Sequence, residues 1–192
     1  GSEMCIRDSH GYEFKPRNPQ PPLLPEANPV GVYRRDFEVP AGWDGRDIYL
    51  HIAGAKSGLY VYVNGKEVGY SEDSKNPAEF LINKYVKPGK NVLTLKIFRW
   101  STGSYLECQD FWRISGIERD VYLYSQPKVA IKDFRITSTL DDTYKNGIFK
   151  LTMDIRNTGS QTSKDYIIGY KVFDPKTNKV IAESEKNSAF NA

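Results

Sequence analysis

The chain has 192 residues and a formal net charge of +3, with 39% hydrophobic and 13% aromatic residues. That length holds one large or two modest domains. Lysines and arginines are interleaved with acidic residues and never form a basic run of five, which argues against a nucleic-acid-binding protein. No apolar stretch approaches a membrane span, and two cysteines are too few for a disulfide framework. Abundant Tyr and Val with scattered Gly and Pro favour β structure.

The amino-terminal part divides into two segments without regular structure. Residues 1–9 show neither a signal-peptide pattern nor any helical or strand period, and we interpret them as a non-native extension. Residues 10–29 carry too many prolines for a helix or a central strand. We expect an extended arm laid over a surface, containing Pro16, Pro19, Pro21, Pro22, Pro25 and Pro29.

Residues 30–126 show many short strand patterns and no long helical period. Asn64-Gly65 is the strongest hairpin signal, because a type I′ turn needs positive φ at both central positions. About eight antiparallel strands at this spacing predict a jelly-roll sandwich. The expected strands are 32–39, 47–53, 59–63, 66–70, 91–98 and 119–125.

Gln126-Pro127 marks a predicted domain boundary. Beyond it, strands are expected at 129–140, 147–157, 164–173 and 180–185, separated by polar turns. Such a pattern begins an immunoglobulin-like sandwich, which needs about seven strands and ~100 residues. We therefore expect residues 127–192 to be a truncated second sandwich, and the chain to be a fragment. The predicted fold class is all-β.

Residues 105–124 are the stretch of the sequence that says most about function. They place Glu107, Asp110, Trp112 and Arg113 between the loop signal Ser101–Ser104 and an apolar strand. A carboxylate beside aromatic rings suits a polyhydroxylated ligand, because it accepts hydroxyl hydrogen bonds while a ring face covers the sugar's C–H surface.

Several motifs, taken together at their spacings, carry a specific resemblance. They are 28–33 (NPVGVY), 63–71 (VNGKEVGYS), Asp73-Ser74, 77–80 (PAEF) and 99–116. Residues 16–124 resemble the sugar-binding domain of family 2 glycoside hydrolases, specifically the bacterial β-galactosidases. Residues 130–192 resemble the immunoglobulin-like domain that follows it in that family.

The resemblance implies an enzymatic function for the parent protein and no activity for this chain alone. The family hydrolyses terminal β-galactosides with retention, using two glutamates of a later barrel domain, and retention requires carboxyl groups about 5–5.5 Å apart. Glu107 and Glu118 fall in the accessory domain, so the chain alone should be inactive and should contribute a loop to the barrel's active site. The implied partners are a β-galactoside and the barrel domain, in a parent that could be a homo-oligomer.

Two residues carry the implied site. Asp110 matches the family aspartate that contacts galactose hydroxyls and a sodium ion, and a hard carboxylate oxygen suits both. A loop aspartate that caps a turn is the alternative. Lys56 stands where some relatives have a sugar-contacting asparagine, but an ammonium donates and cannot accept, so a solvated loop lysine is an equal alternative. Magnesium is expected only in the parent, outside this chain.

The neighbours of Asp110 have structural interpretations. Trp100 and Trp112 are expected to pack in the core rather than stack on sugar, and Cys108 to be a small buried group rather than a nucleophile. Arg99 and Arg113 could pair with Asp110 or Glu107 and hold the loop rigid.

Two other functions compete with the enzyme subdomain. One is a stand-alone carbohydrate-binding sandwich without catalysis, and the other is a scaffold for oligomer contacts. Unpaired strand edges in a truncated sandwich argue against an independent lectin. The sequence leaves the compartment open between cytoplasm and periplasm.

Overall fold

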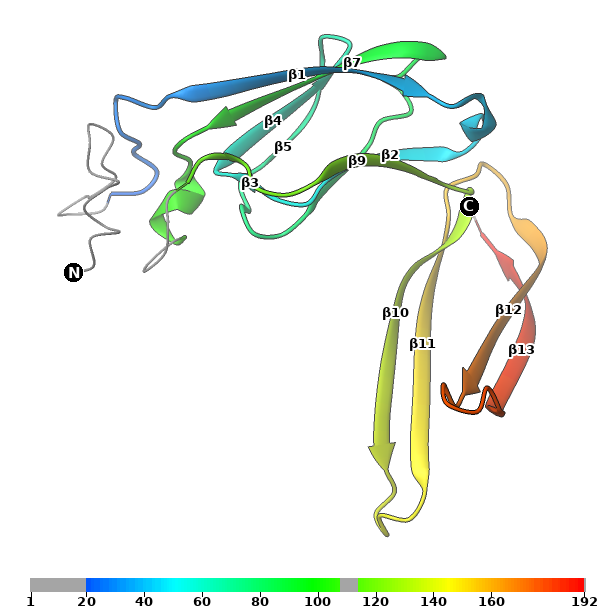
Figure 1. Cartoon of the computed structure of the whole chain (residues 1–192). Helices are drawn as coiled ribbons and strands as arrows, with labels where there is room; N and C mark the ends of the chain where they lie inside the picture. Colours follow the sequence, from blue (N-terminus) through cyan, green and yellow to red (C-terminus); the bar gives the residue numbers. More distant parts are fainter. Residues whose placement is uncertain (1–19, 108–113, 192) are drawn as a thin grey trace. The chain divides into compact units, whose positions relative to one another are not determined.

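The computed structural model describes residues 20–107 and 114–191. It is nearly all β-strand, and the chain divides into two compact units, Gly1–Ser125 and Gln126–Ala192 (Figure 1). The all-β fold class is confirmed. Within the described ranges, no helix is long and apolar enough to cross a membrane.

The first unit is a sandwich of two sheets, seen as two layers in Figure 1. The four-stranded sheet has the order β1-β7-β4-β5, and the three-stranded sheet has the order β6-β2-β9. A short pair, β3 with β8, lies beside them. The bounds are β1 Val30–Val39, β2 Asp47–Ile52, β3 Ala55–Lys56, β4 Gly58–Val63, β5 Lys66–Ser71, β6 Ala78–Leu81, β7 Gly89–Phe98, β8 Gly116–Ile117 and β9 Val121–Gln126, with 3₁₀ turns η1 Ala41–Trp43 and η2 Thr102–Tyr105.

The six expected strands of this unit are confirmed to within about two residues. β3, β6 and β8 were not predicted, because each has four residues or fewer and too short a run to show alternation.

The core of the first unit follows the strand period. Ile48, Leu50 and Ile52 project from one face of β2 and are at most 5% exposed. They pack with alternate residues of β4 and β7, including Val61 and Leu95. Each fully buried side chain of this kind contributes about 1.5–3 kcal/mol. His51 projects from the opposite face of β2, where its ring stacks on that of Tyr122 at 4.5 Å between centroids.

The Asn64-Gly65 turn has the predicted geometry. Asn64 has φ of 52° and Gly65 of 78°, so both central residues are left-handed and the hairpin β4–β5 closes tightly. The Asn64 side chain also donates to the carbonyl of Tyr85 at 2.9 Å and accepts from the amide of Val92 at 3.0 Å. Both residues are therefore structural.

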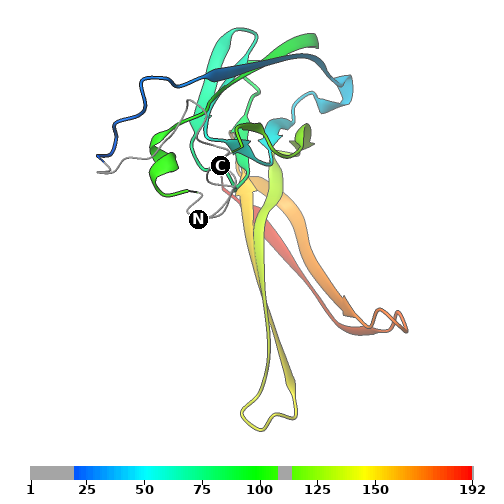
Figure 2. The ribbon, with the colours of Figure 1, turned by 60° about the vertical axis from the view of Figure 1, so that its left-hand side comes forward.

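The second unit consists of two long hairpins. β10 (Val129–Leu140) pairs with β11 (Gly147–Asn157), and β12 (Ser163–Phe173) pairs with β13 (Val180–Phe190). Figure 2 shows β10 and β11 side by side as a long two-stranded hairpin that ends at the Asp141–Asn146 turn. Both pairs are two-stranded sheets. In the described part of this unit, Val129 is the only buried hydrophobic residue.

Candidate functional site

The segment 108–113 lies outside the described residues, but both of its flanks are firmly held. On the amino-terminal side, the Glu107 carboxylate accepts hydrogen bonds from the Ser74 amide at 3.0 Å and the Ser74 hydroxyl at 2.6 Å. On the carboxy-terminal side, Gly116 pairs with Lys56, and the amide of Glu118 donates to the carbonyl of Gly54 at 3.0 Å. The two flanks therefore attach the segment to two neighbouring parts of the sandwich.

A second carboxylate fixes the turn η2 that leads into this segment. Glu72 accepts hydrogen bonds from the Gly103 amide at 2.8 Å and the Tyr70 hydroxyl at 2.5 Å, and a further one from Thr102. Burial alone would raise the pKa of Glu72, but the hydrogen bonds from Thr102, Tyr70 and Gly103 outweigh it, so its pKa is lowered. Glu72 therefore stays ionised and acts as an anchor for η2.

The proline-rich arm also attaches at the base of this loop. The Asn28 side chain donates to the carbonyl of Trp100 at 3.0 Å and accepts from the Trp100 amide at 2.9 Å. The hydroxyl of Tyr105 donates to the carbonyl of Leu23. These contacts attach residues 23 and 28 to Trp100 and to Tyr105 of η2, while the extended arm expected over residues 10–29 stays a prediction.

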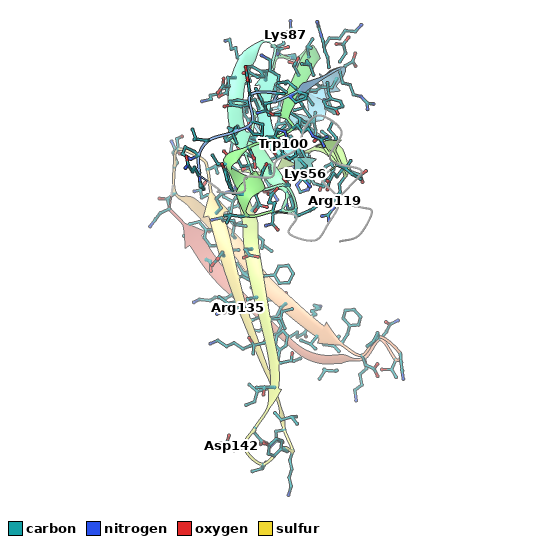
Figure 3. All side chains as sticks on the ribbon, turned by 90° about the vertical axis from the view of Figure 1, so that its left-hand side faces the viewer. Lys56, Lys87, Trp100, Arg119, Arg135 and Asp142 are labelled. Atoms are coloured by element: carbon teal, nitrogen blue, oxygen red, sulfur yellow. The ribbon has the colours of Figure 1, made fainter. Side chains whose placement is uncertain are left out.

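Lys56 is buried, with 4% of its surface exposed, so the interpretation as a solvated loop lysine is wrong. It lies in β3 (Lys56 is labelled in Figure 3) and pairs with Gly116 of β8. A buried lysine is rare unless it is paired, and Lys56 does have an interaction partner. The structure thus brings Lys56 next to the strand by which the 108–113 segment returns to the sandwich.

The other predicted loop residues have mixed outcomes. Asp110, Cys108, Trp112 and Arg113 lie outside the described residues, so their roles stay predictions. Trp100 is 3% exposed, which confirms its packing in the interior. The guanidinium of Arg99 lies 4.9 Å from the centroid of the Trp100 ring, and Glu107 is bound by Ser74.

Sequence reasoning missed Glu72 and assigned no structural role to Asn28 or Ser74, which were noted only as parts of motifs. Asp73-Ser74 was noted only as part of a motif, and Glu72 precedes it directly. The only available signal for this role was the run of three polar residues, Glu72 to Ser74, between two strands. Glu72 and Ser74 bind Thr102, Gly103 and Glu107, which are 30–33 residues away in sequence, so no local pattern could reveal these contacts.

The metal prediction has no test here. Within residues 20–107 and 114–191, no three His, Cys, Asp or Glu side chains lie close enough to hold a metal ion. A sodium ion at Asp110 remains a prediction.

The chain is similar to known proteins over most of its length. Residues 12–127 match the family model of the glycosyl hydrolases family 2 sugar binding domain. The chain is 43% identical over 163 residues to the β-galactosidase of Priestia megaterium, covering 84% of this chain and 16% of that protein. It is 38% identical over 185 residues to the β-galactosidase of Vibrio cholerae, covering 96% and 17%.

Solved structures give the same fold. Bacteroides uniformis β-glucuronidase 2 matches with a TM-score of 0.76 and 20% identity, over 85% of this chain and 20% of that one. An uncultured Clostridium sp. β-glucuronidase matches with a TM-score of 0.62 and 27% identity, over 84% and 29%.

These matches identify the family of the chain and show how much of the length of its relatives the chain covers. The chain spans 16% and 17% of the length of the Priestia and Vibrio proteins. The family match covers the sandwich and the loop anchored by Glu72, Ser74 and Glu107. The chain therefore belongs to glycoside hydrolase family 2, and residues 12–127 are its sugar-binding domain.

Proposed function

We propose that the chain is the sugar-binding part of a β-galactosidase and that its 108–113 segment reaches into the active site of the parent enzyme. The observation that carries the proposal is the double anchorage of this segment, by Glu107 on Ser74 and by β8 on β3. Surface loops normally rely on water for their polar groups. Here two side chains and a strand pair hold the flanks in fixed positions.

Such anchorage suits a group that must orient a substrate from outside the barrel. Positioning one substrate hydroxyl contributes to catalysis only if the positioning group is itself fixed, because small displacements lose the advantage of proximity. In this proposal the Asp110 carboxylate accepts hydrogen bonds from galactose hydroxyls. Lys56, from its buried position beside Gly116, can donate to a hydroxyl or to a carboxylate but cannot accept.

The choice of galactoside over glucuronide rests on sequence. Identity to the β-galactosidases of Priestia and Vibrio is 43% and 38%, whereas identity to the two β-glucuronidase structures is 20% and 27%. The catalytic glutamates belong to the later barrel domain in this proposal, so the chain by itself is inactive.

A hybrid enzyme tests the proposal. The aligned residues of this chain would replace those of the Priestia megaterium β-galactosidase, and hydrolysis of p-nitrophenyl β-galactoside and β-glucuronide would be measured. We expect the hybrid to hydrolyse the galactoside and not the glucuronide. A hybrid that melts cooperatively but hydrolyses neither substrate, or prefers the glucuronide, contradicts the proposal.

A further inference from the structure

The turn between β5 and β6 contacts both flanks of the 108–113 segment. On the amino-terminal flank, Ser74 of this turn donates two hydrogen bonds to the carboxylate of Glu107. On the carboxy-terminal flank, the ammonium of Lys75 lies 2.6 Å from the carboxylate of Glu118. Two consecutive residues of one turn therefore bind both flanks of the segment.

The turn is itself held in shape by Asp73. The Asp73 carboxylate accepts hydrogen bonds from the Asn76 side chain at 2.7 Å, from the Asn76 amide at 3.3 Å and from the Lys75 amide at 3.4 Å. The bond from the Asn76 side chain is the main reason that the pKa of Asp73 is lowered, and an aspartate that binds backbone amides in this way stabilises a turn. Asp73 thus acts on the two flanks through the positions of Ser74 and Lys75.

The turn also lies against the backbone that receives the returning chain. The carbonyl of Gly54 accepts a hydrogen bond from the Glu118 amide at 3.0 Å. A Cβ added to Gly54 would lie 3.4 Å from the side chain of Arg119 and 3.5 Å from the carbonyl oxygen of Ser74, and Arg119 donates to the carbonyl of Lys75 at 3.4 Å (Arg119 is labelled in Figure 3). A shift of the turn would therefore displace the carboxy-terminal flank as well as Glu107.

The pair formed by Lys75 and Glu118 contributes more to geometry than to stability. Their side chains are 45% and 21% exposed. Ion pairs this open to water add little to the free energy of unfolding, because solvent and salt screen them. A direct contact at 2.6 Å nevertheless fixes the distance between the turn and the flank that bears Glu118. The pair is thus suited to setting a position.

We propose that the β5–β6 turn sets the position of the 108–113 segment, and that Lys75 and Glu118 are positioning residues for the proposed hydrolysis. This inference rests on the proposed function, in which the segment contacts the galactoside. Because one turn binds both flanks, a change in the turn displaces the sugar-contacting group as a whole. A displacement of about 1 Å can lower a rate about 10²-fold. Changes in this exposed pair should therefore reduce catalysis without reducing stability.

Charge reversal in the hybrid with the Priestia megaterium β-galactosidase tests the kinetic role. Lys75→Glu and Glu118→Lys each place like charges together, and each should lower kcat/KM for p-nitrophenyl β-galactoside at least about fivefold. The melting temperature should stay nearly unchanged. The double variant restores an ion pair and should recover kcat/KM to within about twofold, which separates this pair from the other interactions of Lys75. Lys66→Glu, the same charge change at an exposed site of β5, is the control and should retain full activity.

The Asp110→Ala hybrid distinguishes positioning from a general structural effect. A positioning residue acts through the group that it positions, so Lys75→Glu should lower kcat/KM of the Asp110→Ala hybrid by less than about twofold. A structural defect would lower kcat/KM equally in both hybrids. Equal losses in the two backgrounds, or a charge-swapped double variant that stays as impaired as the single variants, overturn the proposal.

Hydrogen exchange in the 192-residue chain tests the coupling of the two flanks without relying on activity. The Gly103 amide, bound by Glu72 at the start of the turn, and the Glu118 amide, bound by the Gly54 carbonyl, report on the two sides. Asp73→Ala should speed exchange at both amides at least about threefold. Asp141→Ala removes a similar turn carboxylate from the β10–β11 hairpin and should change neither.

Faster exchange at only one of the two amides, or at neither, overturns the proposal, because the turn would then not couple the flanks. An unchanged hybrid without galactosidase activity contradicts the proposed function instead, and the exchange result still decides whether the turn holds both flanks together.

Discussion

Ser74 donates two hydrogen bonds to the carboxylate of Glu107, from its amide at 3.0 Å and from its hydroxyl at 2.6 Å. Ser74 is fully buried in the turn between β5 and β6, and Glu107 immediately precedes the 108–113 segment. The pair joins two loops that are 33 residues apart in sequence. It is the contact through which the sandwich sets where the proposed sugar-binding segment begins.

Glu107→Gln should destabilise the first unit and loosen the loop. The change removes the charge and places an amide N–H₂ near a donor, so about 1.5–3 kcal/mol of charge-assisted hydrogen bonding is lost. We expect a lower urea midpoint with an unchanged m-value, and faster hydrogen exchange at the amide of Ser74. Glu38→Gln, an exposed change on β1, is the matched control and should have no effect. Equal midpoints for the two variants would show that the Ser74 contact contributes nothing.

The lowered pKa of Glu72 predicts how stability depends on pH. A carboxylate whose folded pKa lies below its unfolded value of 4.5 contributes stability that is fully present above pH 4.5. That contribution is lost as pH falls through the folded pKa. Urea midpoints measured from pH 6 to pH 3 should therefore fall more steeply for the unchanged chain than for Glu72→Gln. Parallel curves would contradict the role of Glu72 as an ionised anchor of η2.

The isolated chain should not hydrolyse a chromogenic β-galactoside above background. In the proposed function the catalytic carboxyl pair belongs to a later domain, and the Glu107 carboxylate of this chain already accepts two hydrogen bonds from Ser74. Turnover would be measured with the purified chain and with Glu107→Gln. Activity that survives purification and disappears in Glu107→Gln would place the chemistry in this domain instead.

Limited proteolysis should remove the second unit first. Its strands expose large apolar side chains, including Phe134 at 61% and Ile167 at 65%, and Val129 is the only hydrophobic residue buried in its described part. Two-stranded hairpins with uncovered apolar faces open easily. We expect cuts near Asp141–Asn146 or Asp174–Asn178, and a resistant core ending near Ser125–Pro127, identified by mass spectrometry. Equal resistance of both units would show that the second unit is a complete domain.

The sequence predicted the parts of the fold that depend on local patterns. Alternation in β2 and β7 identified the core faces, and the left-handed pair Asn64-Gly65 fixed the β4–β5 hairpin. All four strands of the second unit were also predicted, although β13 extends to Phe190, beyond the expected end at Glu185. Each of these depends on neighbouring residues, whose periods can be read directly.

The site depends on contacts between residues that are far apart in sequence, and local sequence patterns do not predict such contacts. The binding of Glu107 by Ser74 and of η2 by Glu72 was missed, because each pair is joined only by the packing of two loops. A solvated loop position was one of the two interpretations of Lys56, yet the residue lies in β3, paired with β8, and is buried. Two-residue strands are too short to show alternation, so that burial could not be predicted.

The most direct test of the account is the effect of Asp110→Ala in the hybrid with the Priestia megaterium β-galactosidase. A charge-assisted hydrogen bond contributes about 1.5–3 kcal/mol, and a lost cation site would add to that. We therefore expect kcat/KM for p-nitrophenyl β-galactoside to fall by at least ~10²-fold, with a nearly unchanged melting temperature and a weaker dependence of the rate on sodium. Asp44→Ala, an exposed change after η1, is the control and should retain full activity. Unchanged kinetics in Asp110→Ala would show that the residue is only a loop aspartate and would contradict the account.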